Sequence, residues 1–274
     1  MYNRTISKKI NRFSKQIFLI DNKNKTNIKY FSSKYANIPV FDQPEKVADY
    51  MMKKYTKSKK DYIGENCTQF QHADQSYKNI QNWCKAYNNN NKFCRINNDF
   101  RKTIGLAAFA HDFGMLWPED KEIQKMISSD GTNLGFKNHG ELGQDFFNAN
   151  GFHPIIGEMS RMHVVAKRAL CSMNQEQINE INKKMIIKLP SPYIIYLSNA
   201  SRKTLLEHQG GLMNESELKR YMKNPLALYS FVIRFCDDNS KYDKSTNSED
   251  FYYKLIVDHL KKYRNSSDFL NGHF

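Results

Sequence analysis

The spacing of apolar residues constrains the fold of this chain more than any other feature, because they recur every three or four positions in one segment after another. That spacing places them on one face of an α-helix, whereas a half-buried β-strand needs alternating apolar and polar residues. No segment alternates convincingly, and no internal repeat is present. The sequence therefore predicts an all-α fold. The predicted helical segments are 44–55, 67–87, 99–117, 139–148, 154–170, 201–209, 214–224, 225–241 and 251–263.

The two ends of the chain differ in composition from its middle. Residues 1–43 are rich in Lys, Asn and Ser, which predicts a basic N-terminal extension, with an organelle-targeting arm as the alternative. Residues 44–265 carry the helical pattern and are expected to form one domain, followed by a short tail at 266–274. Within the domain, residues 172–190 are mostly polar and predict an inserted, exposed excursion.

The charge balance favours anionic partners. The 274 residues include 42 Lys and Arg against 28 Asp and Glu, a formal net charge of +14. This excess suits phosphorylated metabolites, nucleic acids or anionic membrane surfaces without choosing among them. No apolar run approaches the roughly 18 residues of a membrane span. The 5 cysteines are scattered and include no C-x-x-C pair, so we expect a protein of a reducing compartment, the cytoplasm, with no membrane contact.

The predicted helix at 99–117 contains an unusual pair of polar residues. Its stretch "LAAFAHDFGMLW", residues 106–117, is apolar for most of its length, yet His111 and Asp112 stand side by side at its centre. Burying an unpaired carboxylate costs several kcal/mol, and an imidazole needs partners for its ring nitrogens. One explanation is a helix-capping Asp beside a core His. The other is a metal ion, whose charge offsets the desolvation of both groups.

Further His and Asp residues on other predicted helices favour the metal. A lone His on an apolar helix face is usually an ordinary core residue, but a series drawn from five helices is poorly explained by chance. The candidate ligands are His72, His111, Asp112, His139, His163 and Asp237. Four imidazoles and two carboxylates exceed the needs of one ion with positions left open for substrate, so they predict a dinuclear site. Asp112 is best placed to bridge the two ions, and ligation without Cys favours Fe, Mn or Zn.

Six short motifs, taken in order, resemble the HD-domain superfamily, which is named for its His-Asp pair. They are "YIGE…QFQHADQ", "LAAFAHDFG", "NHGELGQDF", "MHVVAKRAL", "LSNASRKTLLEHQGGLM" and "VIRFCDDNSK". The "HVVAKR" and "QGG" stretches are not general features of HD hydrolases. They narrow the resemblance to the diiron oxygenase branch of PhnZ type, which oxidises organophosphonates.

This resemblance implies an HD-domain helical bundle around two iron ions in a mixed-valence Fe(II)/Fe(III) state, with Asp112 bridging them. One iron would bind the substrate and the other O2. The implied reaction hydroxylates the carbon next to phosphorus, or oxidises a hydroxylated carbon until the C–P bond breaks and phosphate leaves. The expected partners are therefore O2 and a small anionic or zwitterionic substrate.

The resemblance also implies roles for residues outside the ligand set. Lys167, one helical turn after His163, would set its ammonium against the phosphonate, and Ser201 would donate to a phosphonate oxygen. Arg234 would add a further donor. Tyr62 would guard the open position at one iron, and Glu65 would address a substrate amine. Together with Asp112, Lys167 and Tyr62 are the expected catalytic residues.

One position departs from the resembled oxygenases. After the His-Asp pair they commonly carry a second His that contacts the substrate, whereas this chain has Met115. Met115 also differs from the Lys that many HD phosphohydrolases have there. An apolar thioether removes one donor from the expected pocket, so the identity of the substrate stays open.

Two other function classes remain as alternatives. A metal-dependent HD phosphohydrolase acting on nucleotides or other phosphate esters would use the same ligands, with Mn or Zn generating a hydroxide nucleophile. A non-catalytic scaffold would use the net charge of +14 to bind nucleic acid. No basic stripe with interleaved aromatic residues is present, so no nucleic-acid partner is expected. The sequence leaves the oligomeric state open.

Overall fold

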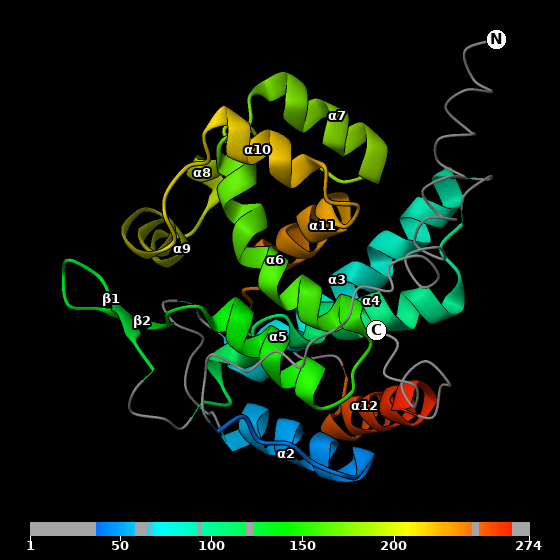
Figure 1. Ribbon diagram of the computed structural model, residues 1–274. Coiled ribbons are helices and arrows are strands. Elements are labelled where there is room, and N and C mark those ends of the chain that lie inside the picture. Colours follow the sequence, from blue (N-terminus) through cyan, green and yellow to red (C-terminus); the bar gives the residue numbers. More distant parts are fainter. Residues whose placement is uncertain are drawn as a thin grey trace.

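A computed structural model describes residues 37–57, 65, 67–91, 95–118, 123–242 and 247–264. Within these ranges the chain forms a bundle of helices (Figure 1), which confirms the predicted all-α class. The predicted extension up to residue 36 and the predicted tail at 266–274 lie outside the described residues. None of the described helices has the length and apolar character needed to cross a membrane.

The helices of the first half follow the predicted order, with one 3-10 turn and two short strands between them. They are α2 (Pro44–Lys57), α3 (Gln69–Asn90), α4 (Asn98–Ala110), η1 (Phe113–Met115), β1 (Lys125–Ile127), β2 (Asn133–Phe136) and α5 (His139–Ala149). Side chains fix where the long helices begin. Thr68 and Gln71 form a reciprocal capping box at α3, and the Asn97 side chain accepts from Phe100 N at α4.

The second half adds the helices that enclose the site. They are α6 (Pro154–Cys171), α7 (Gln175–Met185), α8 (Tyr193–Tyr196), α9 (Asn199–Lys203), η2 (Thr204–His208), α10 (Glu215–Met222), α11 (Ala227–Asp238) and α12 (Glu249–Arg264). The segment η2 is one turn of π-helix, a form that often marks functional sites. It leads into Gly210 and Gly211, which both have positive φ, so this turn requires the glycine pair of the "QGG" stretch.

The centre of the bundle is α4, in which every residue from Thr103 to Ala110 is buried. It packs against α3 and α6, while α6 also contacts α5 and α11. Helices α2 and α12 pack together along one side of the bundle, as Figure 1 shows. This arrangement explains why the α4 sequence is apolar nearly all round, and it directs the end of α4 into the interior.

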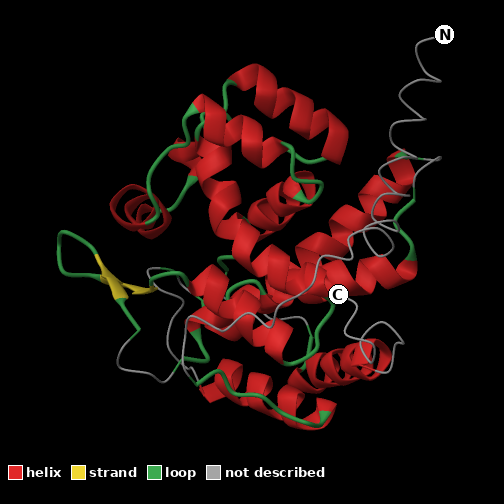
Figure 2. Cartoon of the chain, viewed as in Figure 1, coloured by secondary structure: helices red, strands yellow, loops and turns green. Residues whose placement is uncertain are grey.

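Three parts of the fold differ from the sequence prediction. The helix predicted at 99–117 ends at Ala110 as α4, and the short 3-10 turn η1 follows the His-Asp pair. Strands β1 and β2 pair as a small antiparallel hairpin (Figure 2), although no strand was expected. The segment 172–190 was expected to be an exposed excursion, but it contains α7, whose Ile178, Ile181 and Met185 are buried in the main core. The polar majority of α7 conceals a narrow apolar face with helical spacing.

Candidate metal centre and its pocket

The four candidate histidines reach the interior from four helices. His72 lies in the first turn of α3, His111 follows the last residue of α4, His139 begins α5, and His163 lies within α6. All four are buried. The Nδ1 atom of each ring lies near a backbone carbonyl oxygen. The distances are 2.6 Å from His72 to Ser240, 2.7 Å from His111 to Ala108, 3.2 Å from His139 to Phe136 and 2.5 Å from His163 to Ser160. Because a carbonyl can only accept, each Nδ1 carries the hydrogen and each Nε2 is left for the centre.

Asp112 lies between two pairs of imidazoles. Its Oδ2 atom is 3.8 Å from His72 Nε2 and 3.5 Å from His111 Nε2. Its Oδ1 atom is 3.6 Å from His139 Nε2 and 3.1 Å from His163 Nε2. Each carboxylate oxygen therefore faces a different pair, which is the geometry expected of a bridging ligand.

Asp237 completes one of the two groups. Its Oδ1 atom is 3.4 Å from His72 Nε2, and its Oδ2 atom is 3.6 Å from His111 Nε2. The six predicted ligands thus form two adjoining groups that could each hold a metal ion; their members are His72, His111, Asp112 and Asp237 in one, and Asp112, His139 and His163 in the other. Ligand atoms bound to one ion at about 2.1 Å lie about 3.0–3.4 Å apart, close to these separations.

The chemistry of the second group fits a bound cation. Burial is the main cause that lowers the pKa of His139 to about 4 and also lowers the pKa of His163, so both rings are neutral near pH 7. Their Nε2 atoms lie 3.2 Å apart, and both Nδ1 atoms already carry the hydrogen. Two lone pairs and the Asp112 carboxylate oxygen therefore converge on one point, and a metal ion would satisfy all three.

The group that contains Asp237 also has an electrostatic environment that favours a bound cation. Burial opposes a charged His111, yet the Asp112 and Asp237 carboxylates outweigh it and raise the pKa of His111 to about 9. Burial would raise the pKa of Asp112 as well, but His111 and His163 hold it well below its usual range. The Oδ1 atom of Asp237 is buried and has no hydrogen-bond partner among the described residues. Both carboxylates thus remain ionised and oriented toward the same point.

Small residues allow the second group to form at the end of α4. A Cβ atom built on Gly114 would lie 1.8 Å from the carbonyl oxygen of His139 and 2.7 Å from Gly143 N. The Ser160 hydroxyl donates to the His111 carbonyl oxygen at 2.8 Å and lies where a Cβ of Gly143 would be. Glycine at position 114 is therefore required for the backbone of α5 to approach the His-Asp pair.

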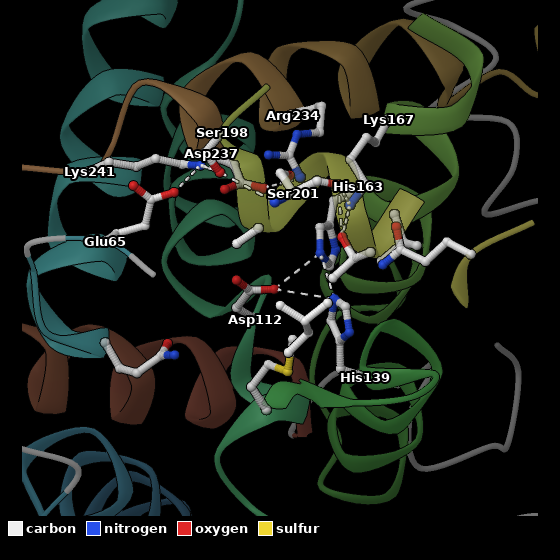
Figure 3. Close-up of a pocket in the computed structure, with 17 residues that line it drawn as sticks. Glu65, Asp112, His139, His163, Lys167, Ser198, Ser201, Arg234, Asp237 and Lys241 are labelled. Carbon is white, nitrogen blue, oxygen red and sulfur yellow. Dashed lines mark hydrogen bonds and ion pairs between the residues drawn. The ribbon is translucent and has the colours of Figure 1, made fainter. Parts of the chain in front are cut away.

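A pocket adjoins the metal-binding groups (Figure 3). Asp112, His139, His163 and Asp237 form part of its wall. The same pocket is lined by residues that the sequence predicted for substrate contact, namely Glu65, Lys167, Ser201 and Arg234, and also by Met115. Tyr62 lies outside the described residues. The structure therefore brings together every predicted site residue that it describes.

Lys167 is buried in the pocket wall, with 4% of its surface exposed. Its Nζ atom donates to Thr204 Oγ1 at 2.9 Å and to the Ser201 carbonyl oxygen at 3.3 Å. Burial, followed by the nearby Arg234 guanidinium, lowers the pKa of Lys167 to about 7. An anion bound in the pocket would stabilise the ammonium form of Lys167.

Arg234 is engaged by carboxylates of its own helix. Its Nη1 atom is 2.5 Å from Asp237 Oδ2, and its Nε atom donates to Asp238 Oδ2 at 2.7 Å. Its Nη2 atom pairs with Asp238 Oδ1. The side chain lines the pocket, but these contacts direct its nitrogens toward the two carboxylates, so its evident effect is to orient Asp237.

Glu65 pairs with a residue that the sequence reasoning missed. Its Oε1 atom lies 2.9 Å from Lys241 Nζ, and the same ammonium donates to Ser198 Oγ at 3.1 Å. Lys241 comes four residues after Asp237, just beyond the end of α11, so nearness in sequence to a predicted ligand is the only local signal for it. Thr204, missed as well, lies one turn after the predicted Ser201.

The β1–β2 hairpin is fastened to the wall of the pocket. Ser129 N donates to Glu207 Oε2 at 2.9 Å, His208 Nε2 lies 3.0 Å from the Ile127 carbonyl oxygen, and Lys203 pairs with Asp130. Leu134 of β2 lines the pocket. The hairpin thus supports the segment that carries Ser201 and Thr204.

Comparison with known proteins gives relatives at two levels of similarity. No family model matches the chain. It is 30% identical over 136 residues to hydroxymethylphosphonate dioxygenase of Gimesia maris, a match covering 49% of this chain and 56% of that protein. It is 25% identical over 157 residues to [1-hydroxy-2-(trimethylamino)ethyl]phosphonate dioxygenase (glycine-betaine-forming) of Leisingera caerulea, covering 57% and 68%. These phosphonate dioxygenases are distant homologues over parts of the chain.

A third relative matches over more of its length. The chain is 32% identical over 207 residues to uncharacterized protein L432 of Acanthamoeba polyphaga mimivirus, a match that covers 75% of this chain and 78% of that protein. This identity and coverage show common descent over most of both chains. The chain therefore belongs to the same protein family as mimivirus protein L432.

Proposed function

We propose that this protein is a metal-dependent oxygenase that uses O2 to oxidise a small organophosphonate at the carbon next to phosphorus. When that carbon already bears a hydroxyl group, oxidation ends in C–P cleavage and release of phosphate. The observation that carries the proposal is the set of six buried His and Asp side chains, arranged in two groups that share Asp112 beside a pocket containing Lys167. The names of two distant homologues support the same reaction class.

In this proposal the two groups would hold a mixed-valence iron pair. His72, His111 and Asp237 would hold one iron, His139 and His163 would hold the other, and Asp112 would be a ligand shared by both groups. When bound, the iron pair supplies the redox chemistry with O2. Nitrogen and oxygen ligands of this kind suit iron, and the carbonyl-bound Nδ1 atoms fix the orientation of each imidazole.

The pocket residues bind and orient the phosphonate. The Lys167 ammonium is placed against a phosphonate oxygen, and Ser201 donates a second hydrogen bond. Arg234 acts indirectly, because it holds Asp237 in position through its Nη1 atom. Tyr62, which lies outside the described residues, keeps the role that the resemblance implies for it.

The substrate class is a small phosphonate with an anionic or zwitterionic character. The substrates named for the two distant homologues differ in size and in charge, since one carries a trimethylamino group and the other does not. Met115 lines the pocket where the resembled oxygenases have a second His. We therefore expect residues particular to this pocket, such as Met115, to determine which substituent the substrate carries beyond the oxidised carbon.

The proposal is tested by loading the protein with iron under anaerobic conditions and then adding O2. The substrates to try are hydroxymethylphosphonate, 2-aminoethylphosphonate and its 1-hydroxy derivative. We expect O2 uptake, with phosphate released from a 1-hydroxy substrate in equal amount, and no activity in the Asp112→Asn variant. Iron-loaded protein that consumes no O2 with any organophosphonate would refute the proposal.

A metal-dependent phosphohydrolase is the second candidate. The two groups of His and Asp ligands that share Asp112 would hold metal ions able to activate water, and the adjacent Lys167 ammonium and Ser201 hydroxyl could bind a phosphate ester. Hydrolysis needs no O2. Release of phosphate from esters by the Mn- or Zn-loaded protein under strict anaerobiosis would favour this candidate over the oxygenase.

A further inference from the structure

Lys241 places a second ammonium group in the pocket. It lies just beyond the end of α11, and Figure 3 shows it beside Glu65, on the side of the pocket away from Lys167. Its Nζ atom is 2.9 Å from Glu65 Oε1, 3.1 Å from Ser198 Oγ and 3.9 Å from Asp238 Oδ1. The side chains of Lys241 and Glu65 are each 14% exposed, so this pair is largely sheltered from water.

The Lys241 contact changes what Glu65 can recognise. A buried carboxylate binds a ligand ammonium when its charge is not already compensated. Here the charge of Glu65 is compensated by Lys241, and Asp238 nearby is bound through both oxygens by Arg234. A ligand ammonium would have to displace Lys241 or accept a like charge close by, and both cost free energy at a sheltered site.

We propose that Lys241 is a specificity-determining residue, which occupies the place of a substrate cation at Glu65. The pocket then selects small phosphonates whose other end is uncharged and disfavours those that end in an ammonium group. This inference rests on the proposed function for the phosphonate end of the ligand. It adds the chemistry of the opposite end.

Lys241 also supports the start of α9, because Ser198 Oγ accepts both from Lys241 and, at 3.3 Å, from Ser201 N. A purely structural role would weaken the binding of every ligand by the same factor when Lys241 is replaced. If Lys241 determines specificity, its replacement changes the ratio of the affinities for two ligands that differ in charge. The ratio of affinities is therefore the readout.

The probes are propylphosphonate and 2-aminoethylphosphonate, which have equal chain length and differ by a methyl group in place of an ammonium group. Dissociation constants are measured by calorimetry with the metal-loaded protein, without O2 and thus without turnover. In the wild type we expect propylphosphonate to bind at least as tightly as the amine. In Lys241→Met, we expect the ratio to shift toward the amine by about tenfold or more, which corresponds to about 1.4 kcal/mol.

Three variants serve as controls. Lys241→Arg keeps the cation and should keep the wild-type ratio. The double variant Glu65→Gln/Lys241→Met removes both charges and should lose the gain for the amine, which isolates the Glu65 charge as its cause. Lys184→Met removes the ammonium of an exposed pair with Glu180 and should change neither affinity. If Lys241→Met does not fold, as judged by its thermal transition, Lys241→Gln replaces it.

The outcomes separate this inference from the proposed function. A wild-type preference for the amine, or an unchanged ratio in a folded Lys241→Met protein, would overturn the role of Lys241. Binding with the expected ratios but no oxidation of any phosphonate would support the role of Lys241 and refute only the proposed reaction. If the wild type bound neither probe, the role of Lys241 would be overturned, whereas the proposed function would still be decided by O2 uptake with the hydroxylated substrates.

Discussion

The buried ammonium of Lys167 should make the stability of the protein depend on pH in a defined window. Lys167 is 4% exposed, and its burial, together with Arg234, lowers its pKa from 10.5 to about 7. An unfolded chain keeps the ordinary pKa of lysine. Between pH 7 and 10.5 the unfolded state therefore binds more protons than the folded state, and the free energy of unfolding rises with pH.

The magnitude follows from the same pKa values. A difference of about 3.5 pH units, at 1.36 kcal/mol per unit, corresponds to about 5 kcal/mol. This cost of keeping Lys167 in the folded protein is fully present below about pH 7 and is lost as the pH approaches 10.5. The expected slope between these limits, away from the two pKa values, is about 1.4 kcal/mol per pH unit.

The assay compares wild type with Lys167→Met by chemical denaturation at several pH values from 7.5 to about 9.5, at equal metal content. We expect the variant to be the more stable protein at the lowest pH, and its advantage to shrink by about 1.2 kcal/mol per pH unit over this range. Loss of the hydrogen bond to Thr204 Oγ1 adds an offset that does not depend on pH. Thr204→Val removes that hydrogen bond and keeps the ammonium, so it should retain the wild-type slope. A difference between wild type and Lys167→Met that is flat across the range would refute the reasoning.

Three further predictions concern the metal centre. Asp112→Asn should lose metal from both groups, because each oxygen faces a different imidazole pair, and a metal-to-protein ratio equal to that of wild type would exclude the bridging role. Gly114→Ala should lower the free energy of unfolding by about 3 kcal/mol, since its Cβ would meet the His139 carbonyl oxygen at 1.8 Å; unchanged stability in a denaturation experiment would contradict this close approach. A chelator should lower both the melting temperature and the free energy of unfolding of the wild type, the latter by about 2.7 kcal/mol if metal had been present at 100 times its Kd. The melting temperature of Asp112→Asn should stay almost unchanged. Equal shifts in the two proteins would show that the chelator acts elsewhere.

The candidate metal centre was predictable because its ligands lie on or directly beside helices whose apolar spacing the sequence displays. His111 and Asp112 directly follow the apolar helix α4, and His139 begins the next helix after the hairpin. Helical periodicity also predicted the fold class, since buried α4 and its neighbours each repeat apolar residues at three or four positions. Which imidazoles pair with each other was not predictable, because pairing depends on how α3, α5 and α6 cross.

The parts that could not be predicted are those too short or too polar to give a periodic signal. Strands β1 and β2 contain 3 and 4 residues, which is too few to display alternation clearly. In α7 the buried Ile178 and Ile181 are surrounded by polar residues, so the segment resembled an exposed excursion. The contact of Glu65 with Lys241 joins residues 176 positions apart, and no local pattern reports such a contact.

Charge pairing in the pocket indicates which cation is left to meet an anionic substrate. Among the described residues that line the pocket, Arg234 is bound to Asp237 and Asp238, and Lys241 is bound to Glu65. Lys167 instead donates to neutral oxygens, the Thr204 hydroxyl and the Ser201 carbonyl. Neutral acceptors do not compensate a buried ammonium, so a phosphonate would gain most by binding at Lys167. The same uncompensated charge causes the loss of folding stability predicted below pH 10.5. The pH-dependent loss of stability and the binding of the phosphonate should therefore disappear together in Lys167→Met.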